Sequence, residues 1–224
     1  SDLLKAGAHF GHQTSRWNPK MRPYIFAVRN NIHIIDLEKT RSKLLDAMVF
    51  AKETAAKGGL VLFVATKRQS KQAVRNAAIA AGMPYVITRW LGGTFTNFRT
   101  IQKTIKKMER YESLKATGEL EKNYTKKERL LFDREIDRLA IYFGGLSQMK
   151  SLPKFLVVID PKKEYIAVAE AKKIGIPVIA LAGSDSNLYE LDYAIPGNDS
   201  SRQSISFVLE QLVKAYRKGK EENG

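Results

Sequence analysis

Hydrophobic residues in this chain follow two patterns, short continuous runs and longer stretches with helical spacing. Continuous apolar runs at 60–64, 155–159 and 177–181 are typical of strands covered on both faces of a sheet. Helical patterns occur from 37 to the Gly58-Gly59 pair and at 66–81, 164–174 and 202–218. Strands that alternate with helices predict βαβ units and a parallel, α/β-class sheet, in which we expect the run at 60–64 to be central.

Shorter apolar runs predict three further strands, at 24–27, 32–35 and 85–87. The first two are separated by Val28-Arg29-Asn30-Asn31, and an Asn-Asn pair suits the tight turn of a β-hairpin. Asp36 follows the second of these strands and is a plausible N-cap for the helix from residue 37. We therefore expect a hairpin that leads directly into the first long helix.

Residues 98–143 interrupt this alternation, because no strand-like run occurs there. Two sets of apolar residues follow helical spacing on either side of Thr117-Gly118: Phe98, Ile101, Ile105 and Met108, then Phe132, Ile136, Leu139 and Phe143. They predict an antiparallel coiled-coil hairpin, although amphipathic helices packed on any core share this spacing. We expect a discontinuous α/β domain, residues 1–97 and 144–224, with the hairpin inserted at 98–143 and projecting toward solvent or a partner.

Positive charge is distributed unevenly along the 224 residues. The chain has 38 Lys and Arg against 23 Asp and Glu, a formal net charge of +15. The surplus is +10 in residues 1–97 (15 basic, 5 acidic), +5 in 98–150 (13 and 8) and zero in 151–224 (10 and 10). This gradient indicates that one side of the molecule faces a polyanion, with a merely basic surface as the alternative.

The composition narrows the class of protein. With 44% apolar and 27% charged residues the chain is typical of a folded globular protein. The absence of cysteine excludes disulfides, thiolate metal sites and cysteine nucleophiles, and it fits a reducing compartment such as the cytoplasm. No run approaches the roughly 18 apolar residues that span a bilayer.

Two segments, 16–24 and 89–99, combine cationic, indole and amide side chains. RNA recognition uses this mixture, because cations bind phosphates, planar groups stack on bases and amides bind base edges and ribose hydroxyls. The candidate RNA-binding residues in these segments are Arg16, Trp17, Asn18, Lys20, Arg22, Arg89, Trp90, Asn97 and Arg99. Trp17 and Trp90 could equally be core residues beneath the loops.

The segment after the strand at 60–64 contains no glycine. A dinucleotide-binding protein needs a glycine-rich turn there to approach the pyrophosphate, so we predict no nucleotide cofactor. Lys67, Arg68 and Lys71 lie at the start of the predicted helix 66–81 and suit a nucleic-acid phosphate. They are further candidate RNA-binding residues, with a solvated basic turn as the alternative.

His9 and His12 are close enough in sequence to suggest a metal site. The third histidine, His33, is remote, and no thiolate is present to complete a tetrahedron, so we predict no metal. Asp185 or Asp199 could supply oxygen ligands in the folded chain, which leaves an ion site as the minor alternative. No spacing indicates a Ser-His-Asp arrangement, and we predict that the chain is not an enzyme.

Six segments together resemble the bacterial ribosomal protein S-two family of the small ribosomal subunit. They are 4–12 (LKAGAHFGH), 16–21 (RWNPKM), 34–40 (IIDLEKT), 89–99 (RWLGGTFTNFR), 144–146 (GGL) and 195–199 (IPGND). Family members commonly carry Asp-Thr-Asn-Cys-Asp-Pro-Asp or similar after the last core strand, whereas this chain has SDSNLYEL at 184–191. This departure removes acidic side chains near Asp185, so the resemblance does not carry an ion site or a partner contact over to that position.

The resemblance implies a Rossmann-like or flavodoxin-like parallel sheet with a protruding coiled-coil hairpin, and a structural role in the cytoplasmic ribosome. It further implies binding to small-subunit ribosomal RNA between head and body, beside neighbouring small-subunit proteins, and help in docking the large mRNA-binding one. We expect no cofactor, no membrane binding and no homo-oligomer. Two alternatives are an α/β enzyme that binds a nucleotide or phosphate ligand, and a peripheral membrane protein.

Overall fold

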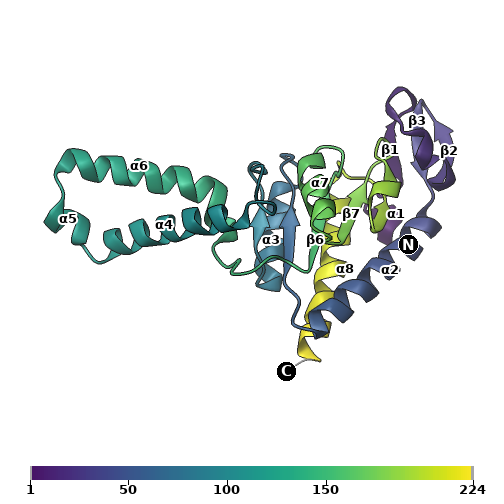
Figure 1. The fold of residues 1–224 in the computed structure, drawn as a ribbon. Helices are drawn as coiled ribbons and strands as arrows, with labels where there is room; N and C mark the ends of the chain where they lie inside the picture. Colours follow the sequence, from purple (N-terminus) through teal and green to yellow (C-terminus); the bar gives the residue numbers. More distant parts are fainter. Residues whose placement is uncertain (1, 223–224) are drawn as a thin grey trace.

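The computed structural model describes residues 2–222, which form two β-sheets, helices around the larger sheet and a long helical hairpin (Figure 1). The elements follow in the order α1 (Asp2–Lys5), β1 (Phe10–Gln13), η1 (Thr14–Arg16), η2 (Pro19–Tyr24), β2 (Ile25–Arg29), β3 (Ile32–Ile35), α2 (Leu37–Ala56), β4 (Val61–Val64), α3 (Lys71–Ala81), β5 (Tyr85–Val86), α4 (Phe98–Ala116), α5 (Glu119–Asn123), α6 (Lys126–Phe143), η3 (Gly144–Leu146), β6 (Phe155–Ile159), α7 (Tyr165–Lys173), β7 (Val178–Ala182), η4 (Leu188–Glu190), β8 (Tyr193–Pro196) and α8 (Arg202–Glu221).

The larger sheet has five parallel strands in the order β5-β4-β6-β7-β8. The chain adds β5 on one side of β4 and then β6, β7 and β8 on the other side. This is the order of a flavodoxin-like doubly wound sheet, whose strand order reverses between β4 and β6. The predicted α/β class is confirmed. Strand β4 lies inside the sheet as expected, although β6 occupies the middle.

Alternate residues of the buried strands face two different helical layers. Val61 and Phe63 of β4 pack in one hydrophobic cluster with α2, α3 and α8. Leu62 and Val64 pack in a second cluster with α7 and the base of the hairpin. A parallel sheet covered on both faces requires continuously apolar strands, and this is why the run at 60–64 contains no polar position.

The smaller sheet is antiparallel, in the order β1-β3-β2. Asn30 and Asn31, with φ of 49° and 59°, form the turn between β2 and β3. Asparagine tolerates this left-handed conformation better than most residues. The predicted hairpin is confirmed, and Asp36 caps α2 by accepting hydrogen bonds from the backbone of Glu38 and Lys39.

Helices α4 and α6 form an antiparallel pair that extends away from the sheets, with α5 at its tip (Figure 1). The buried residues of the pair follow the predicted spacing: Ile101, Ile105, Met108, Ile136, Leu139 and Phe143. The tip is longer than the predicted turn at Thr117-Gly118, because α5 and the capping box at Thr125 lie between the two long helices. The coiled-coil geometry of the hairpin and the division into domains stay predictions. The first and last residues of the predicted α/β domain, 1 and 223–224, lie outside the described residues.

Three elements differ from the sequence-based expectation. Strands β1 and β8 were not predicted, because each is only four residues long and lies at the edge of its sheet. β1 has no apolar pattern, and the short apolar run of β8 ends in Pro196. Helix α3 begins at Lys71 rather than at Thr66. The Thr66 backbone N–H donates to the Glu164 side chain, which holds the chain in a turn before the helix starts. No helix within residues 2–222 has the length and apolarity needed to cross a membrane.

Candidate nucleic-acid interface

The parallel sheet brings the three predicted basic segments to one edge. Residues 65–70 follow β4 and residues 87–97 follow β5, so both segments leave the carboxyl ends of their strands. The N-terminal segment is tied to the carboxyl end of β7, because the backbone N–H of Asn18 donates to Ser184 O at 2.9 Å. The His12 N–H donates to Ser184 Oγ at 2.7 Å. With neighbouring strands about 4.8 Å apart, the three segments share one edge of the molecule.

Five arginines of these segments are exposed and form no ion pair with any residue in the range 2–222: Arg16, Arg22, Arg68, Arg89 and Arg99. We call them the edge arginines. An exposed cation without a carboxylate partner can bind a phosphate without first breaking an ion pair. The structure therefore groups five of the predicted RNA-binding residues on segments that share one edge.

Lys67 does not belong to this exposed group, and its predicted contact with RNA stays a prediction. Its ammonium group pairs with Asp160 and lies 3.9 Å from Asp199 Oδ1, and its side chain is 22% exposed. Burial opposes the charge, but the carboxylates of Asp199 and Asp160 raise the pKa of Lys67. Lys67 follows β4 and Asp160 follows β6, so this ion pair lies at the reversal of strand order, where doubly wound proteins bind ligands.

The two tryptophans have different environments. Trp90 is 5% exposed, packs edge-on against Phe95 and donates its indole N–H to Glu170 at 3.2 Å. Of the two alternatives for Trp90, the structure therefore favours the core. Trp17 is half-buried and its ring lies 4.9 Å from the ring of His33. Contact of Trp17 with RNA stays a prediction.

The remaining candidates belong to the same segments, and each is partly buried or already contacts another residue of the chain. Lys20 lies over the ring of Tyr189 at 5.8 Å, and the Asn18 side chain accepts a hydrogen bond from the Lys20 backbone. Lys71 is half-buried as the first residue of α3. Asn97 is exposed and accepts a hydrogen bond from Thr100 Oγ1 at the start of α4. Their predicted contacts with RNA stay predictions.

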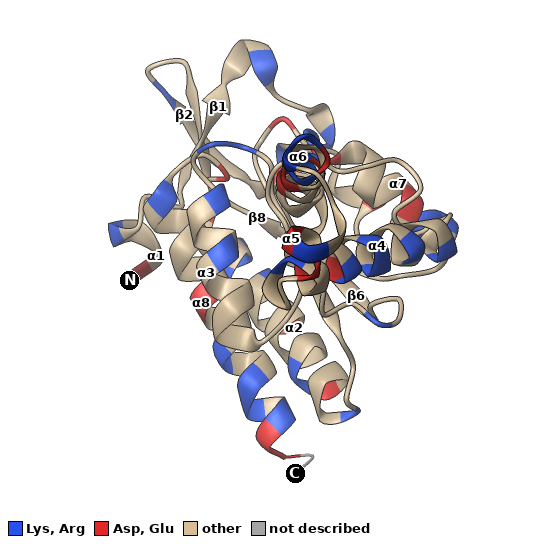
Figure 2. Ribbon diagram, turned by 90° about the vertical axis from the view of Figure 1, so that its left-hand side faces the viewer, with Lys and Arg blue, Asp and Glu red and all other residues tan. Residues whose placement is uncertain are grey.

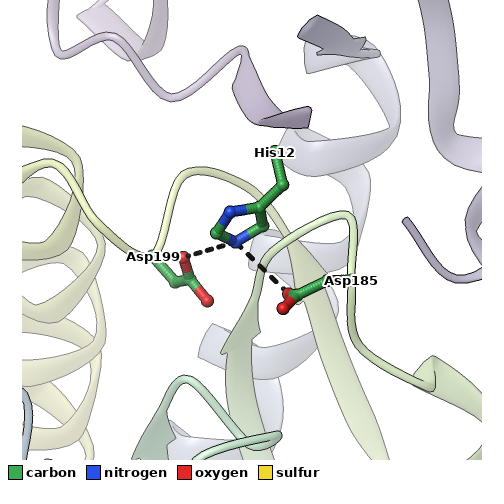
Figure 3. Close-up of side chains that lie close together, drawn as sticks. All are labelled: His12, Asp185 and Asp199. Atoms are coloured by element: carbon green, nitrogen blue, oxygen red, sulfur yellow. Dashed lines mark ion pairs between the residues drawn. The ribbon is translucent and has the colours of Figure 1, made fainter. Parts of the chain in front are cut away.

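A polar cluster lies behind this edge, where His12 contacts two carboxylates (Figure 3). His12 Nε2 lies 3.2 Å from Asp185 Oδ1 and 3.4 Å from Asp199 Oδ1. The carboxylate of Asp185, followed by that of Asp199, raises the pKa of His12 to about 9. Burial opposes ionisation of Asp185, but His12 and Lys162 hold its pKa well below the usual range. At neutral pH the cluster is an ion-paired link between β1 and the loops after β7 and β8.

The same three side chains could hold a cation. One ligand atom from each of His12, Asp185 and Asp199 lies within 4.8 Å of the others, and imidazole nitrogen with carboxylate oxygen is a common donor set. Asp199 Oδ2 accepts no hydrogen bond in the described part of the chain. A bound cation must displace the proton of His12. The prediction that the chain binds no metal is therefore untested, and an ion site at these three residues stays the minor alternative.

Charge on the surface differs from the charge counted along the sequence. Residues 151–224 contain ten acidic and ten basic side chains, but Asp160, Glu164, Glu170 and Asp199 are buried. Figure 2 shows Lys and Arg on α3, on α4 and on the C-terminal part of α8. The surface of residues 151–224 is thus more basic than their net charge of zero indicates.

Sequence reasoning considered Asp199 as an oxygen ligand but did not predict the contacts of buried Asp160 and Glu170 at this edge. Asp160 directly follows a buried strand, and its position at the carboxyl end of that strand was a usable signal. Glu170 lies within the amphipathic pattern of α7, and nothing in the sequence indicates that it contacts residues 90–96. Ser184 is likewise recognisable only after β7 and the N-terminal segment are placed together.

Comparison with known proteins gives one consistent family. Residues 3–219 match the family described as "Ribosomal protein S2". "Small ribosomal subunit protein uS2" of Sulfurimonas denitrificans is 48% identical over 219 residues, covering 98% of this chain and 84% of that protein. The proteins of the same name from Nitratiruptor sp. and Bdellovibrio bacteriovorus are 47% and 46% identical, covering 98% and 99% of this chain and 82% and 70% of those proteins.

Proposed function

The chain belongs to the ribosomal protein S2 family, and from this premise we propose that it binds small-subunit ribosomal RNA through the edge arginines. As a member of that family it is a structural, non-enzymatic constituent of the small ribosomal subunit, and it takes part in translation in the cytoplasm. The family assignment does not say which residues bind RNA, and our proposal names them.

The observation that supports the proposal is the convergence of Arg16, Arg22, Arg68, Arg89 and Arg99. They come from three segments of which the strand order places two, and hydrogen bonds to Ser184 place the third at the same edge. None of the five has a carboxylate partner in the range 2–222. Guanidinium groups bind phosphate oxygens in a two-pronged geometry, and such contacts position a protein on RNA without reading bases.

The crevice at the reversal of strand order argues against the alternative of a nucleotide-binding enzyme. Lys67 is paired with Asp160 at the reversal of strand order, and residues 65–71 contain no glycine for the close approach of a pyrophosphate. The family assignment agrees, because ribosomal protein S2 has a structural role. RNA binding is therefore the better supported of the two functions.

We further propose that the protein lies between head and body of the subunit and helps dock the large mRNA-binding protein. The support is the resemblance of the six sequence segments together with the projecting hairpin, whose far end offers a second surface away from the sheets (Figure 1). A neutral C-terminal surface is a weaker argument for protein neighbours, because buried acids account for part of that neutrality.

Incorporation into small subunits tests the proposal. The edge variant changes Arg16, Arg22, Arg68, Arg89 and Arg99 to Glu. Lys67 is left unchanged, because a carboxylate there would face buried Asp160 and prevent folding. The control variant changes five exposed cations of α7 and α8 to Glu, namely Lys173, Lys214, Arg217, Lys218 and Lys220. Both variants lower the net charge equally, from +15 to +5, since five reversals remove ten charges.

The edge variant is expected to be absent from purified small subunits while circular dichroism shows a folded protein. The control variant is expected to incorporate at or near the wild-type level. Incorporation of the edge variant at the wild-type level, or equal loss of both variants, would show that binding does not depend on these arginines.

A further inference from the structure

Glu170 is a buried carboxylate that points from α7 into the segment between β5 and α4. Its residue is 8% exposed, and it pairs with no cation in the described part of the chain. An isolated buried carboxylate is costly unless its oxygens are well hydrogen-bonded. The partners of this side chain therefore define its role.

Five donors from residues 90–96 surround the two oxygens of Glu170. Oε1 accepts from Trp90 Nε1 at 3.2 Å and from the Gly93 backbone N–H at 2.7 Å. Oε2 accepts from the Phe95 and Thr96 backbone N–H groups at 2.9 and 3.1 Å, and from Thr96 Oγ1 at 3.3 Å. Burial opposes ionisation, but these backbone N–H groups keep the pKa of Glu170 below its usual value.

Trp90 and Phe95 anchor residues 87–97 by apolar packing in the core, and Glu170 is their main polar anchor. Residues 87–97 contain no helix or strand, and their remaining hydrogen bonds are local, such as Asn97 N–H to Gly93 O at 2.8 Å. Gly93 has φ of 91°, a conformation that other residues rarely adopt. Within residues 2–222, the hydrogen bonds that tie this segment to distant parts of the chain all end on Glu170. An untethered segment would lose about 1–2 kcal/mol of conformational freedom per residue on binding.

The outer side of the same segment carries two edge arginines. Arg89 directly precedes Trp90, and Arg99 follows the tethered turn in the first turn of α4. Both are exposed, as is Asn97. One carboxylate thus holds the inner side of the segment, while the guanidinium groups of its outer side stay free for a ligand.

We propose that Glu170 is a positioning residue for RNA binding, which fixes Arg89 and Arg99 by tethering residues 90–96. This inference rests on the proposed function. It requires an acceptor with two oxygens, because each oxygen receives at least two donors. A glutamine would turn an NH₂ group toward N–H donors and break one half of the tether.

Glu164 provides a matched control for the substitution of Glu170. It is also a buried glutamate of the α7 segment, and it accepts from both the backbone N–H and the hydroxyl of Thr66. Both bonds end on the same oxygen, Oε1, so a glutamine preserves them. Glu164→Gln therefore makes the same chemical change without releasing its loop.

The test measures binding of the full chain to small-subunit ribosomal RNA. Four proteins are compared with wild type: Glu170→Gln, Glu164→Gln, the pair Arg89→Ala with Arg99→Ala, and all three changes Glu170→Gln, Arg89→Ala and Arg99→Ala together. Glu170→Gln is expected to weaken binding about tenfold and Glu164→Gln less than about twofold. The triple variant is expected to bind as the arginine pair does, because Glu170 acts only through those arginines.

Three results would overturn the inference: wild-type affinity for Glu170→Gln, equal weakening by Glu164→Gln, or a full additional loss in the triple variant. Failure of wild type to bind the RNA would instead refute the proposed function. If Glu170→Gln does not fold, Trp90→Phe removes one donor of the tether and keeps an aromatic ring in the core. Trp90→Phe alone is expected to weaken RNA binding, whereas the same change added to Arg89→Ala and Arg99→Ala is expected to weaken it no further. Unchanged binding by Trp90→Phe alone would count against the tether.

Discussion

Lys67 and Arg68 are adjacent in the chain, but their side chains meet different surroundings. Lys67 turns inward to Asp160 and Asp199, whereas Arg68 is exposed without an ion pair in the range 2–222. The sequence could place both residues after a buried strand. It could not distinguish them, because the carboxylates that bind Lys67 follow other strands and approach it only in the folded sheet. Trp90 is a comparable case, since its partner Glu170 is 80 positions away.

His12 gives a prediction about pH at the same scale. Its pKa rises from 6.5 to about 9 in the folded chain, through contacts with Asp185 and Asp199, while Lys67 and Lys162 also face this cluster. Because protonated His12 is favoured in the folded state, it contributes its full stabilisation below pH 6.5, and this contribution is lost as pH rises through 9. The pKa of Asp185 is lowered, so its contribution is lost only in acid, below its usual value.

Substitution of His12 tests this contribution. Urea unfolding with EDTA present should show His12→Gln less stable than wild type by about 2 kcal/mol at pH 6, with the difference vanishing near pH 9.5. His33→Gln is the control, because burial lowers the pKa of His33 and no carboxylate within residues 2–222 pairs with it, so its loss removes no stabilisation that disappears near pH 9. A difference for His12→Gln that stays constant from pH 6 to 9.5 would contradict the ion-paired cluster.

At the scale of elements, helical and buried-strand patterns were predictable and short edge strands were not. The apolar run at 155–159 matches β6, because a strand covered on both faces needs no pairing information to be recognised. β1 has the sequence FGHQ, and only its antiparallel pairing with β3 makes it a strand. The start of α3 was predicted five residues early, because Glu164 holds Thr66 in the preceding turn.

The hairpin allows a matched test of its buried stripe. Leu139 of α6 is buried at 5% exposure in the cluster at the hairpin base, whereas Leu131 of the same helix is 57% exposed. Leu139→Ala should lower the free energy of unfolding by about 3 kcal/mol, because it removes buried carbon and leaves a cavity. Leu131→Ala should change it by less than about 0.5 kcal/mol. Equal losses in urea unfolding would show that α4 and α6 do not pack as described.

For the whole molecule, the fold converts a gradient of charge along the sequence into a basic edge. The strand order places residues 65–70 and 87–97 beside the N-terminal segment, while buried carboxylates hold these segments from within. The sequence predicted the basic segments and their chemistry. It could not predict that acidic residues of the C-terminal third would be buried behind the edge, because that depends on how the parallel strands are ordered.

The salt dependence of binding to small-subunit ribosomal RNA tests the central claim most directly. If the edge contacts about six to ten phosphates, the logarithm of the binding constant should fall with the logarithm of salt concentration with a slope of roughly −5 or steeper. The slope should become shallower by about one unit for each edge arginine removed that contacts a phosphate, and the equally charged α7 and α8 control should retain it. A wild-type slope near zero, or the same slope for both variants, would contradict the account.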